Sequence, residues 1–261
     1  MTLVGVIGRF VLNRLRALRN LAAVAISAVW LGMRPGSWPR TVRTVLARQI
    51  FFTGVQAVLF MTGLAVFVGL GVVVQAQFWM ARLGQSELLG PFLVIVIVRE
   101  IGPLLVNLVV IGRSGTAMAT ELGSMSIRNE VKVLDAQGLD PMIYLVMPRI
   151  LGTAISVFCL AVLFAVVSLG SGYFCGLLLG VGRGSVGLFL FSVMKSLTPA
   201  DILNLLAKTL APGLLVGAIC CVEGLAVRYV TEVPQAATRC VVRANFTVFM
   251  ICSVVSLLTY I

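Results

Sequence analysis

Apolar residues in this chain gather into long runs rather than into alternating positions or narrow helical stripes. Short segments rich in charge, glycine or proline separate the runs and predict loops. A membrane-spanning helix needs about 20 mostly apolar residues, and several runs reach that length. The pattern therefore predicts an all-α integral membrane protein with transmembrane helices at about 50–74, 88–111, 150–179, 202–227 and 244–261.

The first 48 residues follow a different pattern, in which arginines surround one apolar block at 21–33. This block of thirteen residues is too short to span a bilayer. A signal peptide is an alternative, because basic residues precede the block. However, Arg34, Arg40 and Arg43 follow it and would have to cross the membrane. We therefore expect residues 1–48 to form an amphipathic helical region in the cytoplasmic interface, ahead of a transmembrane domain over 49–261.

Composition and charge agree with a membrane protein. The 261 residues are 60% hydrophobic, with a mean hydropathy of +1.09. A net charge of +11 would suggest nucleic-acid binding in a soluble protein. Here eight of the twenty basic residues precede the first long apolar run, as in cytoplasmic flanks of membrane proteins. We expect no nucleic-acid partner, a cytoplasmic N-terminus and, after five spans, a C-terminus on the opposite side.

Several kinds of chemistry are disfavoured by the residue types. The chain has no histidine, which excludes histidine-based catalysis and imidazole metal ligands. Its six cysteines lie in apolar runs without C-x-x-C spacing, so we expect them to act as small hydrophobic residues rather than in a metal site or disulfide. No G-x-x-x-x-G-K-[ST] motif occurs, so the chain does not hydrolyse ATP by itself. We expect no catalytic residue, bound metal or cofactor.

The second predicted span holds two charges, Arg99 and Glu100, followed by Pro103. A charge at bilayer depth costs about 3 kcal/mol. Pro103 has no backbone N–H, so the carbonyl of Arg99 loses its helical partner and the helix should bend. Two interpretations remain open. The charges either pair with neighbouring helices, where Lys208 and Glu223 are candidate partners, or they contact a substrate or gate.

A short amphipathic helix is predicted at 126–138, between the second and third spans. Ser126 suits the N-cap, and Gly138 suits a left-handed C-terminus. The helix either rests on lipid headgroups or docks into a protein groove. Its mixed charge favours the groove, since an anionic membrane would select a basic face. Just before it, Gly115, Ala119 and Gly123 are spaced by four, which predicts close packing between helices or subunits.

Four segments also resemble a known family: REIGPLL (99–105), GRSGTAMATELGSM (112–125), EVKVLDAQGLDP (130–141) and MPR (147–149). They are similar to the MlaE (YrbE) permease subunits of lipid-transporting ABC systems that work with MCE proteins. At TEVPQA (231–236) the chain departs from the glycine-rich segment of that family, which leaves a second ATPase contact there in doubt. The resemblance implies a non-catalytic permease that moves phospholipid between the bacterial inner membrane and a periplasmic MCE protein, maintaining outer-membrane asymmetry or lipid supply.

Partners and sites follow from the same resemblance. It implies a homodimer, a cytoplasmic P-loop ATPase (MlaF-like) that carries ATP and Mg, a periplasmic MCE-domain protein (MlaD-like), and room for a small STAS-like accessory subunit. The C-terminus would be periplasmic. The implied lipid cavity is lined by Gln75, Trp79, Met80, Leu83, Arg99 and Glu100. The implied ATPase-coupling residues are Arg128, Glu130, Val131, Leu134, Asp135, Gly138 and Asp140.

Other functions remain as alternatives. One is an ABC permease or channel subunit for another hydrophobic substrate, such as a sterol or a toxic organic compound. The other is a membrane scaffold or intramembrane enzyme, for which the missing histidine removes one common catalytic group. Bound phospholipid and a tightly bound ATPase would distinguish the phospholipid permease from both.

Overall fold

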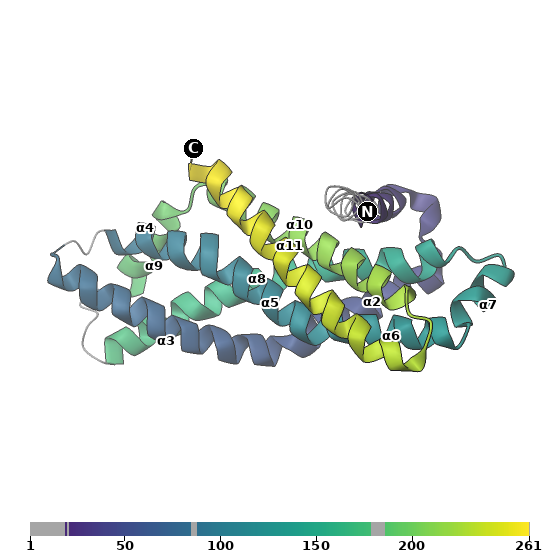
Figure 1. The fold of residues 1–261 in the computed structure, drawn as a ribbon. Coiled ribbons are helices and arrows are strands. Elements are labelled where there is room, and N and C mark those ends of the chain that lie inside the picture. The colour runs from purple at the N-terminus through teal and green to yellow at the C-terminus, as the bar shows by residue number, and fades with distance from the viewer. Residues whose placement is uncertain (1–18, 20, 85–87, 179–185, 261) are drawn as a thin grey trace, which may run out of the picture.

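The computed structural model describes residues 19, 21–84, 88–178 and 186–260 (Figure 1). In this part of the chain all regular structure is helical. The predictions for residues 1–18, for the end of the third span and for the loop after it lie outside the described residues. The α-helices are α2 (Arg40–Thr53), α3 (Val58–Arg82), α4 (Leu89–Leu93), α5 (Gly102–Val110), α6 (Thr116–Ile127), α7 (Glu130–Ala136), α8 (Met147–Leu178), α9 (Val186–Ser196), α10 (Pro199–Leu225) and α11 (Val233–Tyr260). Shorter helical segments are η1 (Pro35–Ser37), η2 (Val55–Ala57), η4 (Val94–Ile101), η5 (Ile111–Gly115), η6 (Met142–Val146) and η7 (Val230–Glu232).

Five helical segments are long and apolar enough to cross a membrane, as predicted. Each extends past its apolar run, because backbone hydrogen bonding continues into the charged flanks. The first segment starts at Arg40 rather than at residue 50, so the boundary expected after residue 48 lies inside α2. The five segments are Arg40–Arg82, Leu89–Ile127, Met142–Leu178, Pro199–Leu225 and Val230–Thr259.

The second span is interrupted where the sequence places its charges. The π-helical segment η4 carries both Arg99 and Glu100 and ends one residue before Gly102. The N–H of Gly102 donates to the carbonyl of Ile97, five residues back rather than four. A second π-helical segment, η5, leads into α6. These widened turns surround Pro103, which cannot donate a backbone hydrogen bond.

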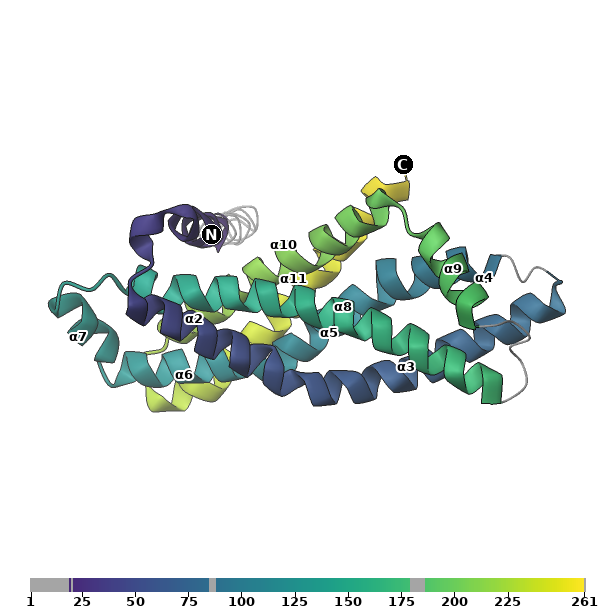
Figure 2. The same cartoon turned by 180° about the vertical axis from the view of Figure 1, so that it is seen from behind.

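Small residues bring the helices of the bundle close together. Helix α8 contacts α2, α3 and α10 and runs through the middle of the molecule (Figures 1 and 2). At the α8–α10 crossing, a Cβ on Gly213 would lie 2.7 Å from the Cα of Ala154. At the end of η5, a Cβ on Gly115 would lie 3.1 Å from the Sγ of Cys220, and on α6 a Cβ on Gly123 would lie 3.4 Å from Val227. The stripe of small residues Gly115, Ala119 and Gly123, which continues from η5 into α6, therefore packs against α10 and α11 of the same chain.

The Leu21–Met33 helix lies against the bundle and keeps an apolar face exposed. Ala25 and Ala28 are buried in a core cluster shared with α8 and α10. Ile26, Trp30 and Met33 are exposed at helical spacing. This helix therefore has one face packed on protein and another available to the membrane interface, as an interfacial helix requires.

Candidate functional site

A polar network joins the second span to α10 and α11. Arg99 forms an ion pair with Asp201, which lies in the first turn of α10 and is fully buried. Asp201 also caps its own helix, because its carboxylate accepts hydrogen bonds from the backbone N–H of Thr198 at 2.7 Å and from the Thr198 hydroxyl at 2.8 Å. Sequence reasoning missed Asp201. The Thr-Pro-Ala-Asp sequence was the available signal, because it has capping-box spacing.

Lys208 of α10 is the centre of this network and is fully buried. Its Nζ donates to the Arg99 carbonyl at 2.9 Å, to Oε1 of Glu100 at 2.7 Å and to Oγ of Ser256 at 2.7 Å. All three ammonium hydrogens therefore have acceptors. Ser256, on α11, also lies 2.9 Å and 3.1 Å from the two carboxylate oxygens of Glu100. The side chain of Glu100 remains 39% exposed, so this carboxylate is an accessible part of the network.

Two prolines explain why side chains of the second span and of α10 hydrogen-bond to each other's backbone carbonyls. Pro103 cannot donate to the carbonyl of Arg99, which accepts from Lys208 instead. Pro212, in turn, cannot donate to the carbonyl of Lys208. The Nδ2 atom of Asn107 reaches that carbonyl at 3.1 Å and the carbonyl of Pro103 at 2.7 Å. Each proline thus leaves a carbonyl that a side chain of the facing helix binds.

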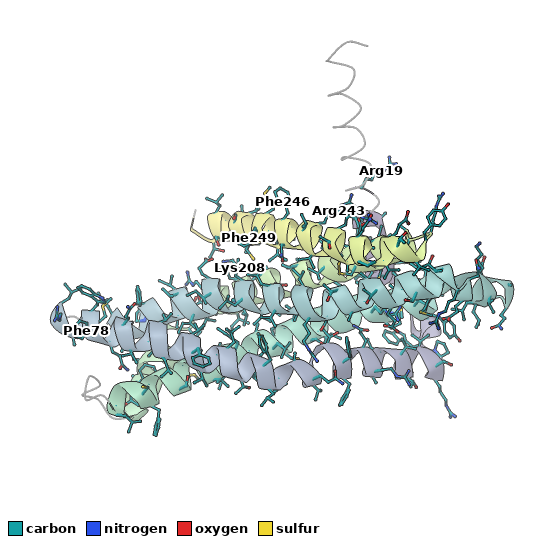
Figure 3. All side chains as sticks on the ribbon, turned by 60° about the horizontal axis from the view of Figure 1, so that its bottom comes forward. Arg19, Phe78, Lys208, Arg243, Phe246 and Phe249 are labelled. Atoms are coloured by element: carbon teal, nitrogen blue, oxygen red, sulfur yellow. A yellow bond between two sulfur atoms is a disulfide. The ribbon has the colours of Figure 1, made fainter. Side chains whose placement is uncertain are left out.

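Of the two candidate partners for Arg99 and Glu100, only one lies beside them. Lys208 pairs with Glu100, in agreement with one candidate pairing. Glu223 does not join this network. It forms ion pairs with Arg239 and Arg243 of α11, so its candidate role as a partner of the second-span charges is wrong. Lys208 and Arg243 lie at different positions along the bundle (Figure 3).

The other residues expected around a lipid cavity lie on the last turns of α3 and, for Leu83, directly after its end. Gln75, Trp79 and Leu83 are exposed at helical spacing, and Met80 is half-buried. Phe78 marks this end of α3, away from Lys208 (Figure 3). Among the described residues, this mostly apolar α3 face is therefore exposed, whereas Arg99 and Glu100 are ion-paired with α10.

The predicted helix at 126–138 is shorter than expected. Helix α6 continues to Ile127, and α7 begins only at Glu130, after Asn129 adopts a left-handed conformation with φ of 58°. Ser126 is therefore not an N-cap. Its hydroxyl lies 3.3 Å from the carbonyl of Leu225 and 3.1 Å from that of Val227, at the end of α10. Sequence reasoning missed this contact because it depends on how α6 meets α10.

Helix α7 projects from one end of the bundle (Figures 1 and 2). It ends in a Schellman motif, with Gly138 at φ of 76° and the N–H of Leu139 donating to the carbonyl of Leu134 at 3.0 Å. The carboxylate of Asp140 accepts from the N–H of Met142 at 2.8 Å and so starts the next helical segment. Val131 and Leu134 pack toward the bundle, whereas Val133 is 53% exposed. Of the remaining residues implied in coupling, Glu130 and Asp135 lie in α7 and Arg128 lies in the turn before it, with a 3.9 Å ion pair between Arg128 and Glu130.

The cysteines show one departure from the expectation. The sulfur atoms of Cys220 on α10 and Cys240 on α11 are paired as a disulfide, and their Cα atoms are 5.3 Å apart. This separation lies within the usual range for disulfides. The expectation that every cysteine is only a small hydrophobic residue is therefore wrong for these two. Helix packing brought them together across twenty residues of sequence.

The comparisons with known proteins agree with this architecture. A family model for the permease MlaE matches residues 46–258, which include α7 and nearly all of the five spanning segments. The chain belongs to the MlaE permease family. This MlaE-family chain is 28% identical over 208 residues to the intermembrane phospholipid transport system permease protein MlaE of Haemophilus influenzae, covering 78% of each chain. It is 26% identical over 213 residues to a probable ABC transporter permease protein of Rickettsia prowazekii, covering 81% of this chain and 82% of that one. The Arabidopsis thaliana chloroplastic protein TRIGALACTOSYLDIACYLGLYCEROL 1 is 29% identical over 160 residues, covering 61% of this chain and 45% of that one.

Proposed function

We propose that this chain is the membrane-spanning permease subunit of an ABC transporter that moves phospholipid between the bacterial inner membrane and a periplasmic MCE-domain protein. The observation that carries the proposal is the family match, which includes α7 and nearly all of the five spanning segments. The Haemophilus influenzae relative is named as a phospholipid transport permease. The basic N-terminal flank supports a cytoplasmic N-terminus and a periplasmic C-terminus.

The energy source would be a partner P-loop ATPase (MlaF-like) that holds ATP and Mg on the cytoplasmic side. The chain has no nucleotide-binding motif of its own. Helix α7 suits the role of coupling helix, because it stands outside the bundle and exposes Val133 together with charged residues of both signs. A short, mixed-charge helix with an exposed apolar side chain fits a protein groove better than it fits an anionic membrane surface.

The substrate cavity would form between two copies of the chain. The exposed α3 face with Gln75, Trp79 and Leu83 offers apolar walls for acyl chains. Arg99 and Glu100 offer a small number of polar groups for a headgroup, and the side chain of Glu100 is 39% exposed. Apolar walls with few polar groups are typical of lipid-sized binding sites. The periplasmic opening would face an MCE-domain protein (MlaD-like).

Movement of α7 would reach this site through α6 and α10. Helix α6 precedes α7 and contacts the end of α10 through Ser126. The other end of α10 holds Asp201 and Lys208, which bind Arg99 and Glu100. Closure of the ATPase dimer against α7 would thus shift α10 and change the network in the second span. The same helix, α10, carries both contacts, and packed helices of this kind are one means by which two distant sites are coupled.

Charge reversal on α7 tests the proposal in the assembled transporter. We expect the double variant Glu130→Lys, Asp135→Lys to lose the co-purified ATPase and its lipid-stimulated ATP turnover. Lys195→Glu is the control, since Lys195 is exposed on α9. Assembly and turnover that survive the double reversal would refute the docking role of α7. Native mass spectrometry of the wild-type complex tests the substrate, and a bound sterol or other hydrophobic compound in place of phospholipid would favour the alternative permease.

A further inference from the structure

The outward face of α3 carries a shallow apolar groove that ends at a cation. One part, of about 450 Å³, is lined by Leu59, Phe60, Gly63, Leu64 and Phe67. A second part, of about 360 Å³, is lined by Phe60, Val109, Gly112 and Arg113. Phe60 lines both parts, so the two hollows adjoin at this side chain, and the second one reaches Val109, Gly112 and Arg113 of the second span. In Figures 1 and 2, α3 lies at the outer edge of the bundle.

Arg113 differs from the other cations of the second and third spans. Arg99 is paired with Asp201, and Arg149 lies 2.9 Å from Glu121. In the described part of the chain, Arg113 has no carboxylate within ion-pair distance. Its guanidinium instead donates to the carbonyl of Phe52 at 3.3 Å and to the side chain of Gln56 at 3.2 Å. Two of its five N–H groups are thereby used, and its positive charge is not neutralised.

The contact with Phe52 also defines the depth of this cation. Phe52 is two residues into the first long apolar run, and exposed Arg48 precedes that run. The guanidinium of Arg113 therefore lies near the boundary between headgroups and acyl chains on the side of the arginine-rich N-terminal region. The groove extends from this level into the apolar layer, over roughly 12 Å of helix between Leu59 and Phe67.

We propose that this groove binds a single anionic phospholipid, with its phosphate on Arg113 and an acyl chain along Phe60 and Phe67. Phosphate is a preferred acceptor for the planar guanidinium. The site is separate from the proposed transport cavity, because its lining residues include neither Arg99 and Glu100 nor the last turns of α3. It also does not depend on the transport proposal, since it requires only that the chain lies in a membrane.

A second copy of this chain fits the groove less well. It would have to supply a carboxylate to Arg113. Among the described residues, the carboxylates of the second and fourth spanning segments are already ion-paired, namely Glu100, Glu121, Asp201 and Glu223. A lipid phosphate brings an unpaired negative charge without breaking one of these pairs.

Glycines provide a matched test. A Cβ on Gly63 meets nothing within 4 Å, so Gly63→Leu fills the groove without displacing protein atoms. A Cβ on Gly71, on the same helix, also meets nothing within 4 Å, and Gly71 lies outside the groove. Gly71→Leu is therefore the control for adding a leucine to α3. Arg113→Gln removes the charge but keeps a donor for the carbonyl of Phe52.

The measurement is native mass spectrometry of the purified full-length chain with equal amounts of phosphatidylglycerol and phosphatidylcholine. We expect the wild type and Gly71→Leu to retain phosphatidylglycerol about fivefold over phosphatidylcholine, the ratio that about 1 kcal/mol of headgroup attraction gives. Arg113→Gln should lose this preference, and Gly63→Leu should bind one phosphatidylglycerol molecule fewer than Gly71→Leu. Lipid retention in Gly63→Leu equal to that in Gly71→Leu overturns the proposal. So does dissociation of a dimer by Gly63→Leu with lipid retention unchanged, which would assign the groove to a subunit interface.

Discussion

The ammonium of Lys208 lies 2.9 Å from the backbone carbonyl oxygen of Arg99, a carbonyl to which Pro103 has no hydrogen to donate. A cation on α10 therefore replaces a missing backbone donor in the second span. The same ammonium neutralises Glu100 at 2.7 Å. The Lys208 side chain thus offsets two unfavourable free energies in this segment. One is that of a backbone carbonyl without a helical donor, and the other is that of a carboxylate at membrane depth.

Replacing Lys208 should destabilise the bundle. Lys208→Met leaves the carboxylate of Glu100 and the carbonyl of Arg99 without their shared donor. Breaking a buried ion pair costs about 3–5 kcal/mol. Because the side chain of Glu100 is 39% exposed, we expect about 2 kcal/mol here. Thermal unfolding in detergent should show a clear drop in Tm. Lys195→Met on exposed α9 is the control and should change stability by less than about 0.5 kcal/mol.

A double variant separates charge burial from general damage at this site. Lys208→Met combined with Glu100→Gln removes the carboxylate that the single variant leaves unpaired. The double variant should therefore unfold at a higher temperature than Lys208→Met alone. An equal or lower Tm would show that the ion pair does not account for the loss.

Adding one methyl group at the α8–α10 crossing should also destabilise the protein. A Cβ on Gly213 would lie 2.7 Å from the Cα of Ala154, which is a backbone atom rather than the end of a flexible side chain. We expect Gly213→Ala to cost about 1–3 kcal/mol, the usual penalty for overpacking. Gly170→Ala on α8 is the same substitution in open space, and it should be neutral or gain up to about 1 kcal/mol from helix propensity. Equal Tm values for both variants would contradict this account.

The turn between α6 and α7 depends on a left-handed residue. Asn129 has φ of 58°, a conformation that glycine adopts freely and that a β-branched residue avoids. Asn129→Val should cost about 1–2 kcal/mol locally, while Asn129→Gly should be nearly neutral. Hydrogen exchange of the amides in α7 measures the effect. Faster exchange in the valine variant than in the glycine variant supports the turn, and the reverse order refutes it.

Ser126 should affect coupling more than assembly. Its hydroxyl binds carbonyls at the end of α10, so Ser126→Ala removes a bond worth about 1 kcal/mol between α6 and α10. In the assembled transporter we expect the ATPase to stay bound while lipid transfer per ATP hydrolysed falls. Ser253→Ala on exposed α11 is the control. Unchanged transfer per ATP would remove Ser126 from the coupling route.

The local features were the most predictable from sequence. The five spanning segments follow from the length of apolar runs, because the hydrocarbon layer sets a minimum length. Gly138 at the end of α7 follows from the requirement for a left-handed C-terminus. The beginning of α7 was missed because Ser126 finds its acceptors on α10 rather than on its own helix.

The polar network around Lys208 could be predicted only in part from the sequence. Pro103 indicated an open carbonyl at Arg99, since proline chemistry acts within one helix turn. It did not indicate that Lys208 would bind that carbonyl across more than a hundred residues, or that Asp201 and Ser256 would complete the site. By sequence alone, Glu223 was as good a candidate partner for the second-span charges as Lys208. In the structure, its position along α10 places it beside Arg239 instead.

The sequence by itself therefore determined the membrane character, the number of spans, the proline that opens the second span and the family, because each depends on neighbouring residues or on a contiguous motif. Only the tertiary structure decided which charges meet, that Ser126 binds the end of α10, and that Arg113 lies at the end of an apolar groove without a carboxylate. Those relationships depend on how each helix is rotated about its axis and how deep it lies relative to its neighbours. Close packing at small residues such as Gly213 determines this rotation and depth, and neither can be derived from the apolar pattern of the sequence.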